Sequence, residues 1–304
     1  MPVDRASWRN VWLYEASTGN LLGGTHQNGS MTGANLLSIL DGILLAVDDQ
    51  WSVKHRDSGI TIGPTNAALQ PGEYDIYCQS SIRVNNEPWV ARLISHCVSG
   101  QVDAFRDGVR ARDGKCVVSG VVNIRAPWNT WSGFEAVHIF PLACESIWME
   151  FNYGRWITDM DSTTGDSGIN SIQNGLVLQG GLHTDFDNYL FSINPDDGYK
   201  ITYFGPDPFG LDGRILDPVC RNPQDPHRVS DALLRWHFRQ AVLANMRGVG
   251  EPIFEHDFPP GTDMLAELRN EPEPYGKQRF EMELFSRLKN GAPKSTPQSK
   301  NSIR

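Results

Sequence analysis

Short apolar runs, each ended by turn-forming residues, restrict this chain to folds with short strands and few long helices. No stretch approaches the roughly eighteen consecutive apolar residues of a membrane-spanning helix. In the first third of the chain, four β-branched or aromatic runs alternate with Gly, Asn, Asp and Pro, which is typical of strands joined by turns. These runs are "NVWLYEA", "WSVKHRD", "GEYDIYC" and "WVARLISHCV". They predict a β-rich N-terminal part.

Three segments have the apolar spacing of helices instead. The segment "LLSILDGILLAV", Leu36–Val47, is expected to pack against the N-terminal sheet. The segment "RVSDALLRWHFRQAVLANMRGVGE" predicts a helix that begins after Ser230, a typical N-cap residue, and ends near Gly248. His237 lies on the apolar face of that helix, so we expect a core residue there and not a ligand. A shorter helix is expected at Arg279–Lys289.

Together these elements predict an α+β protein in four parts. Residues 1–109 form the β-rich N-terminal part, and residues 110–205 form a central module. That module opens with "VRARDGKCVVSG", which predicts a turn at Asp113–Gly114 followed by an apolar strand. Residues 206–289 form a helical C-terminal part that packs against the module, and the polar residues 290–304 form a disordered tail. The first three parts are expected to make one compact body.

Composition limits the functions open to the chain. Its formal net charge is -9, whereas proteins that hold a nucleic acid by its phosphates usually present a basic surface. The five cysteines are widely spaced without a CxxC pair, which argues against a zinc ribbon or a disulfide framework. The opening sequence "MPVDRASWRN" lacks the features of a signal peptide. We expect an intracellular protein, cytoplasmic or nuclear, that is neither secreted nor bound to a membrane.

A histidine inside an apolar run marks the candidate site. His138 stands in "FEAVHIFPLA", where a strand built for the core carries a proton acceptor. Further along, Asn174 precedes another apolar run, and "LHTDFD" places His183 and Asp187 four residues apart. On a helix this spacing puts the imidazole and the carboxylate on one face, where they can hold one cation. A divalent cation would polarise a phosphodiester, while a neutral histidine takes the proton from the attacking water.

These segments resemble a known family. "FEAVHIFPL", "NSIQNGLVL" and "LHTDFD" are similar to the His, Asn and His elements of the HNH nucleases, whose ββα-metal finger is a β-hairpin followed by a helix around one metal. The resemblance implies that His138 is the general base and Asn174 the residue that orients it. It also implies that His183 is a catalytic and metal-binding residue, with Asp187 as a further ligand of a divalent ion (Mg, Mn or Zn). The sequences on both sides of these segments are similar to those of filamentous-fungal proteins identified as HNH nucleases. With them the resemblance covers nearly the whole chain.

Two features depart from the family pattern. Val137 stands where many HNH nucleases carry an Asp or His that supplies another metal ligand. Between Cys116 and Gly205 there are ten acidic and three basic side chains, a net charge of -7, whereas a nuclease is expected to be basic around its site. This balance favours a small or weakly charged substrate, or an inactive relic of the nuclease fold. Glu135, Arg155 and Asp185 are further candidates for the site, and the sequence does not rank them.

Three functions are consistent with the sequence. The first is metal-dependent phosphodiester hydrolysis of the endonuclease type. The second is an HNH fold recruited to small-molecule chemistry, such as tailoring or cyclisation of a fungal secondary metabolite, in an acidic pocket lined by the aromatic residues of "WNTWSGF" and "SIWMEFNYGRW". The third is a catalytically inactive binding protein. The substrate is accordingly a nucleic acid or a small molecule, and the sequence leaves the oligomeric state open.

Overall fold

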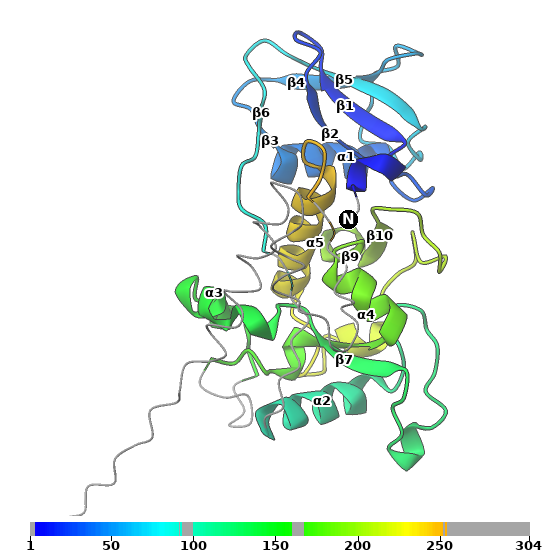
Figure 1. The fold of residues 1–304 in the computed structure, drawn as a ribbon, viewed down its shortest axis with the longest axis vertical. Helices are drawn as coiled ribbons and strands as arrows, with labels where there is room; N and C mark the ends of the chain where they lie inside the picture. The colour runs from blue at the N-terminus through cyan, green and yellow to red at the C-terminus, as the bar shows by residue number, and fades with distance from the viewer. Residues whose placement is uncertain (1–3, 91, 93–99, 160–166, 252, 254–304) are drawn as a thin grey trace, which may run out of the picture. The chain divides into compact units, whose positions relative to one another are not determined.

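The computed structural model describes residues 4–90, 92, 100–159, 167–251 and 253. They belong to one compact unit, Val3–Ile253. The helix predicted at Arg279–Lys289 and the tail predicted at 290–304 lie outside the described residues. Helices and strands are mixed along the unit (Figure 1), which confirms the predicted α+β class.

The N-terminal part contains a four-stranded sheet built from β1 (Val11–Glu15), β2 (Leu21–Thr25), β4 (Trp51–His55) and β5 (Gly72–Cys78). The strand order is β2-β1-β5-β4, with β1 and β5 parallel and the other pairs antiparallel. Alternate residues of β1 are buried, so one face of the sheet covers a core. Strands are confirmed for the first three predicted runs, while most of "WVARLISHCV" lies outside the described residues.

Helix α1 (Gly33–Ile39) contributes to the same core. It begins at Thr32, whose side-chain oxygen accepts a hydrogen bond from the Asn35 amide, while the Asn35 side chain bonds back to Thr32. The helix continues as one wider π-helical turn that ends at Leu44. The helix predicted at Leu36–Val47 is therefore confirmed up to that residue. Two short strands follow, β3 (Leu45–Ala46) and β6 (Arg83–Val84), which pair antiparallel.

Helix α2 (Gly100–Asp113) was not expected in a part of the chain predicted to be β-rich. It ends before Gly114, whose positive φ of 64° stops the helix. The predicted turn at Asp113–Gly114 is therefore the end of a helix, and a turn takes the place of the apolar strand predicted after it. The helix forms because Phe105 and Val109, one turn apart, bury their side chains in a shared apolar cluster with Val177.

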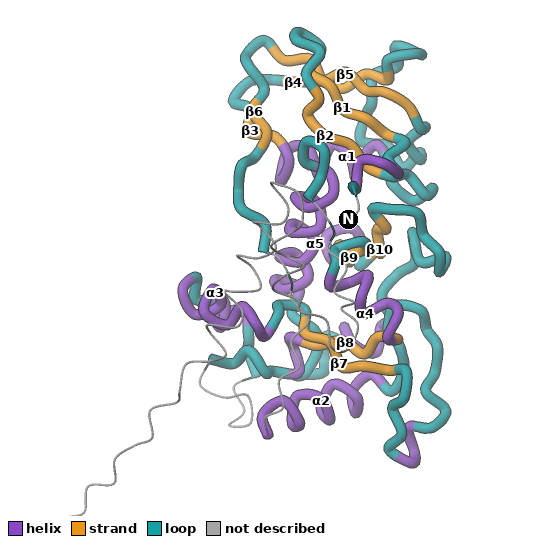
Figure 2. Tube along the Cα trace, in the orientation of Figure 1, coloured by secondary structure: helices purple, strands orange, loops and turns teal. Residues whose placement is uncertain are grey.

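The central module is a β-pair followed directly by a helix. Strand β7 (Phe134–His138) runs antiparallel to β8 (Gly175–Gln179), with His138 opposite Gly175, and α4 (Gly180–Asp187) begins where β8 ends. Figure 2 shows α2 on one side of the β7–β8 pair and α4 on the other. Helix α3 (Glu145–Glu150) lies in the connection between the two strands. This order of elements is the ββα arrangement that the motif predicts.

Helix α5 (Asp231–Met246) joins two hydrophobic cores. The prediction of this helix, with Ser230 at the N-cap position, is confirmed. Leu233 and Leu234 near its start pack into the core of the central module, whereas Val242 near its end packs into the core beneath the N-terminal sheet. His237, between these two groups, is completely buried, as expected of a core residue.

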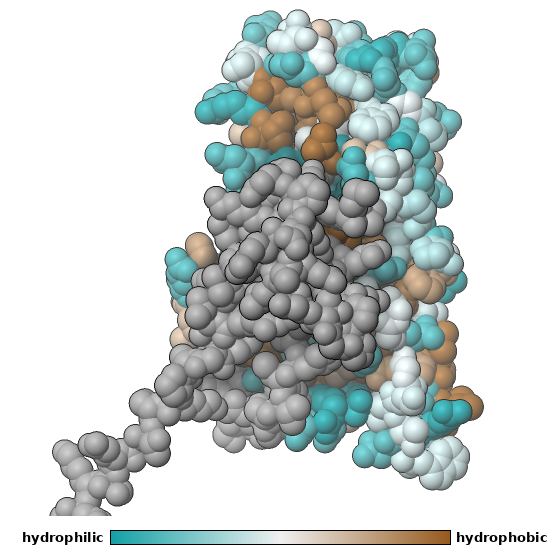
Figure 3. Space-filling model, in the orientation of Figure 1, coloured by the Kyte–Doolittle hydropathy of each residue, from teal (hydrophilic) through white to brown (hydrophobic). Residues whose placement is uncertain are grey.

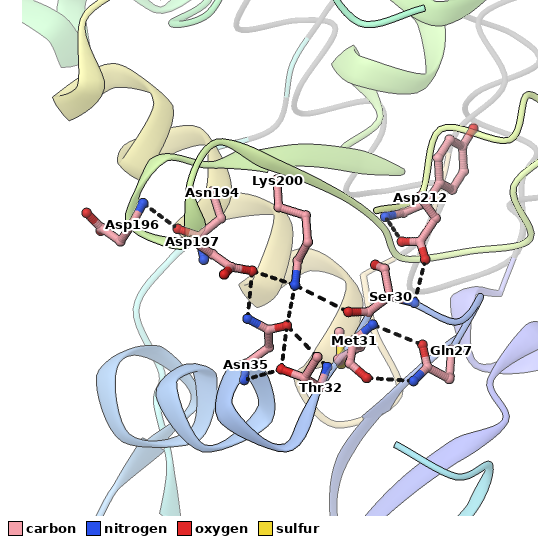
Figure 4. Close-up of polar contacts among 11 residues, drawn as sticks. Gln27, Ser30, Met31, Thr32, Asn35, Asn194, Asp196, Asp197, Lys200 and Asp212 are labelled. Carbon is pink, nitrogen blue, oxygen red and sulfur yellow. Dashed lines mark hydrogen bonds and ion pairs between the residues drawn. The ribbon is translucent and has the colours of Figure 1, made fainter. Parts of the chain in front are cut away.

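A polar cluster connects the N-terminal part with the hairpin formed by β9 (Phe191–Asn194) and β10 (Lys200–Tyr203). The ammonium group of Lys200 lies 2.6 Å from the Asn35 side-chain oxygen and 2.5 Å from a carboxylate oxygen of Asp197 (Figure 4). The Asn35 amide donates to the same Asp197 carboxylate at 2.9 Å. The cap of α1 is thereby tied to a hairpin that lies far along the chain.

Candidate functional site

His138 lies at the end of β7 with its ring held between the strand pair and α2. The ring stacks on Phe105 of α2 at a centroid distance of 3.8 Å and an interplanar angle of 9°. Gly175, opposite His138 in the strand pair, leaves room for this approach, because a Cβ there would lie 2.6 Å from the Phe105 ring. The unexpected helix α2 therefore supplies one wall around the imidazole.

A hydrogen bond and burial together determine the protonation of His138. Its Nε2 lies 3.2 Å from Oδ1 of Asn170, and in the neutral imidazole this places the proton on Nε2 and leaves Nδ1 as an acceptor. Burial lowers the pKa of His138 to about 4, against the opposing effect of the Asn170 bond. At neutral pH the ring is uncharged, which is the form that accepts a proton from water.

Asn174 holds the backbone beside His138 and not its ring. The side chain is completely buried; its oxygen accepts from the Phe140 amide at 2.8 Å, and its amide donates to the carbonyls of Phe140 and Ile169 at 3.1 and 2.9 Å. The bond to the imidazole, expected from Asn174, is made by Asn170. Sequence reasoning did not single out Asn170, because no spacing relates it to His138 before the chain folds.

His183 and Asp187 project from the same face of α4, as their spacing predicts. Nε2 of His183 lies 3.1 Å from Oδ2 of Asp187, and Nδ1 of His183 contacts a carboxylate oxygen of Glu135 on β7. Burial opposes protonation of this imidazole, but its hydrogen bonds to Asp187 and Glu135 outweigh that effect and raise the pKa of His183. The ring therefore bridges two carboxylates. Glu135, an unranked candidate from the sequence, lies in contact with His183.

Arg92 contacts the other oxygen of Asp187. Its Nη2 lies 2.7 Å from Asp187 Oδ1 and donates to the His138 carbonyl at 2.6 Å, and its Nη1 donates to the Ile139 carbonyl at 2.5 Å. Burial favours the neutral acid at Asp187, but the charges of Arg92 and His183 outweigh it and lower the pKa of this carboxyl. Sequence reasoning missed Arg92. The available signal was a single cation within the apolar run "WVARLISHCV".

Two segments of the chain match known families. Residues 8–83 match a domain of unknown function, DUF8573. Residues 116–194 match the family model described as HNH endonuclease, and this range contains β7, β8 and α4 with His138, Asn174, His183 and Asp187. Residues 116–194 form an HNH domain. No curated protein and no solved structure matches the chain. Similarity to the fungal group stays a prediction.

The HNH domain does not present its implied ligands in a form that fits a divalent ion. Both ring nitrogens of His183 face carboxylates, and the two oxygens of Asp187 face Arg92 and His183. An ion on Asp187 would lie beside the guanidinium. Val137 is 1% exposed and has no donor atom. Across the ranges that the structure describes, no group of three or more His, Cys, Asp or Glu side chains is placed to hold a metal.

The aromatic residues of the HNH domain pack mainly against one another. Trp148 is completely buried, and Phe140 contacts the rings of Trp148 and Tyr153 at centroid distances of 5.2 and 5.4 Å. These three rings belong to the core of the domain or pack against it; the aromatic pocket stays a prediction. Other apolar side chains are exposed on the loop before β7, where Figure 3 shows hydrophobic surface; Ile124 and Trp128 are 78% and 77% exposed.

The helices within the described ranges include none that is long and apolar enough to cross a membrane.

Proposed function

We propose that the HNH domain hydrolyses phosphodiesters with His138 as the general base. The observation that carries this proposal is an imidazole that is neutral at physiological pH at the end of β7, inside a ββα unit that matches the HNH endonuclease family. Nδ1 of His138 accepts a proton from water while the water oxygen attacks phosphorus. The bond from phosphorus to the leaving oxygen breaks, and that oxygen takes a proton from solvent.

Asn170 and Asn174 act as positioning residues in this proposal. Asn170 fixes the tautomer of His138 through Nε2, and Asn174 holds the backbone of Phe140, two residues beyond the base. His183 binds a phosphate oxygen: the Glu135 side chain at its Nδ1 is 52% exposed, so a phosphate can replace it there. Despite burial, the hydrogen bonds to Asp187 and Glu135 raise the pKa of His183, which favours the protonated ring; that form offsets negative charge on the phosphate.

A divalent ion on His183 and Asp187, which the family resemblance implies, requires both side chains to change partners first. The proposed steps therefore use only side chains of the protein, and dependence on Mg²⁺, Mn²⁺ or Zn²⁺ is left to measurement. The substrate we favour is a nucleic acid or a short phosphodiester. The net charge of -7 between Cys116 and Gly205 disfavours long polyanions, so binding of DNA should be weak and strongly dependent on salt.

Nicking of supercoiled plasmid at low salt tests the proposal, with bis(4-nitrophenyl) phosphate as a small diester in parallel. Each is assayed with Mg²⁺, with Mn²⁺, with Zn²⁺ and with EDTA. The His138→Ala variant should lose about 10²–10⁴-fold in rate, which is the usual contribution of a general base. His55→Ala, in β4 of the N-terminal sheet, is the matched control and should keep the wild-type rate. Equal rates for His138→Ala and wild type, or no cleavage of either substrate by wild type, would contradict the proposal.

A further inference from the structure

Arg92 lies outside the segment that matches the HNH family, yet its guanidinium is part of the HNH site. Its side chain is 3% exposed, and it reaches the backbone carbonyls of His138 and Ile139 as well as the Asp187 carboxylate. Its Cζ also lies 5.1 Å from the centroid of the Phe186 ring on α4. A buried cation with contacts on β7 and on α4 is fixed between the two elements that the family uses to surround its ion.

Each carboxylate oxygen of Asp187 lies beside a nitrogen of another side chain, although Oδ1 makes an ion pair with Arg92 without a hydrogen bond among the described residues. Oδ1 faces Arg92 and Oδ2 faces His183, at 2.7 and 3.1 Å. The guanidinium group of an arginine is a cation in proteins at neutral pH. A divalent ion that bound Asp187 would have to displace Arg92 or share its carboxylate, and a displaced Arg92 would leave a buried cation without its partner. Removing one partner of a buried ion pair is strongly unfavourable.

We propose that Arg92 takes the place of the divalent ion in this HNH domain, as a built-in counter-ion that keeps metals off Asp187. The inference concerns the site of the proposed hydrolysis but does not require that reaction. It assigns to Arg92 a specificity role: the cation between β7 and α4 is supplied by the chain, from a residue that precedes the matching segment. Its test measures metal binding alone. A failure of the proposed hydrolysis can therefore be distinguished from a failure of this inference.

Titration of the full chain with Mn²⁺ by calorimetry tests the inference. Arg92→Gln removes the charge but keeps an amide that can donate to the carbonyl of His138 or Ile139. We expect this variant to gain one Mn²⁺ site at least tenfold tighter than any site of the wild type. The double variant Arg92→Gln, Asp187→Asn should lose that site, and it avoids an unpaired buried charge because both partners are changed together. Arg92→Lys, which keeps the charge, should behave like wild type.

Two results would overturn the inference. One is a wild type that binds one Mn²⁺ as tightly as Arg92→Gln, and the other is a folded Arg92→Gln that gains no site. If Arg92→Gln does not fold, as judged by circular dichroism, thermal unfolding of the wild type with and without Mn²⁺ decides. A ligand that binds the folded state raises Tm. An unchanged Tm supports the inference, and a raised Tm overturns it.

Discussion

The stacking of Phe105 on the His138 ring depends on Gly175, because this position has no Cβ. A Cβ at this position would lie 2.5 Å from a Val109 methyl group and 2.6 Å from the Phe105 ring. We expect Gly175→Ala to lower the free energy of unfolding by about 1–3 kcal/mol, as overpacking of a core does, measured by urea unfolding. Gly42→Ala is the matched control, because a Cβ at Gly42 meets no atom within 4 Å. A loss of stability no larger than that of the control would show that α2 moves freely.

His237 should make the folded state sensitive to acid. The ring is completely buried; Nε2 donates to the Phe186 carbonyl at 3.2 Å, and Nδ1 accepts from the Ser192 hydroxyl at 2.7 Å. Burial lowers the pKa of His237 well below its usual value. Below about pH 6.5 the unfolded chain therefore takes up a proton that the folded chain does not, and the free energy of unfolding falls, by up to about 1.4 kcal/mol per pH unit.

The measurement for His237 is urea unfolding at pH 7.5 and pH 5.0, for the wild type and for His237→Gln. The drop in stability between the two pH values should be smaller in the variant, because its side chain does not titrate. His138, whose pKa is also lowered, contributes in the same direction in both proteins, so part of the drop remains. A variant with the full wild-type drop would show that His237 does not cause the acid sensitivity.

At the scale of residues, the sequence predicted contacts within one element and missed contacts between elements. The spacing of His183 and Asp187 was sufficient to place them together, because one helical turn relates them. Asn170, Glu135 and Arg92 reach the site only when separate segments pack, and no periodicity in the sequence reports that approach.

At the scale of elements, α2 holds β8 by a buried ion pair. Asp113 accepts from the Val177 amide at 2.8 Å, and Arg112, 2.7 Å from Asp113, donates to the Gly175 carbonyl at 2.7 Å. Both side chains are at most 3% exposed. The charged end of α2, which precedes the HNH domain, therefore helps to hold the β7–β8 pair in place. This arrangement predicts that the ion pair between Arg112 and Asp113 is essential for the stability of the fold.

Asp113→Asn should cost about 3–5 kcal/mol, because it leaves the Arg112 cation buried without its charge partner. Asp107→Asn on the exposed face of α2 is the control: its side chain is 64% exposed in its pair with Arg106, and surface pairs contribute about 0–1 kcal/mol. Chemical unfolding of both variants measures the difference. Similar small losses in the two variants would contradict the assigned role of Asp113.

The elements themselves were predicted unevenly for physical reasons. Helix α5 has an apolar face repeated over sixteen residues, so its pattern is strong. Helix α2 is mostly polar, and in its described side chains only Phe105 and Val109 are buried apolar residues. Two buried apolar residues with a glycine between them give too weak a periodic pattern to predict a helix. Gly108 is explained only in three dimensions, where a Cβ would lie 2.4 Å from the Ile172 side chain.

At the scale of the whole molecule, α5 contributes residues to both cores, so we expect the two cores to unfold together. Leu234 belongs to the core of the HNH domain and Val242 to the core beneath the N-terminal sheet. We expect Leu234→Ala and Val242→Ala each to lower the same single thermal transition of residues 3–253, monitored by calorimetry and by far-UV circular dichroism. Two separate transitions, each shifted by only one variant, would show that the cores are independent.

The contact between Arg92 and Asp187 crosses the boundary of the matching HNH segment, and this has an evolutionary consequence. If the guanidinium of Arg92 and the carboxylate of Asp187 each need the other as a charge partner, natural selection acts on the two positions together. Related chains that keep Arg at the position of Arg92 should then keep Asp at that of Asp187, and chains that lose the Arg should regain a ligand at the position of Val137. A search confined to the motif would overlook half of this covariation.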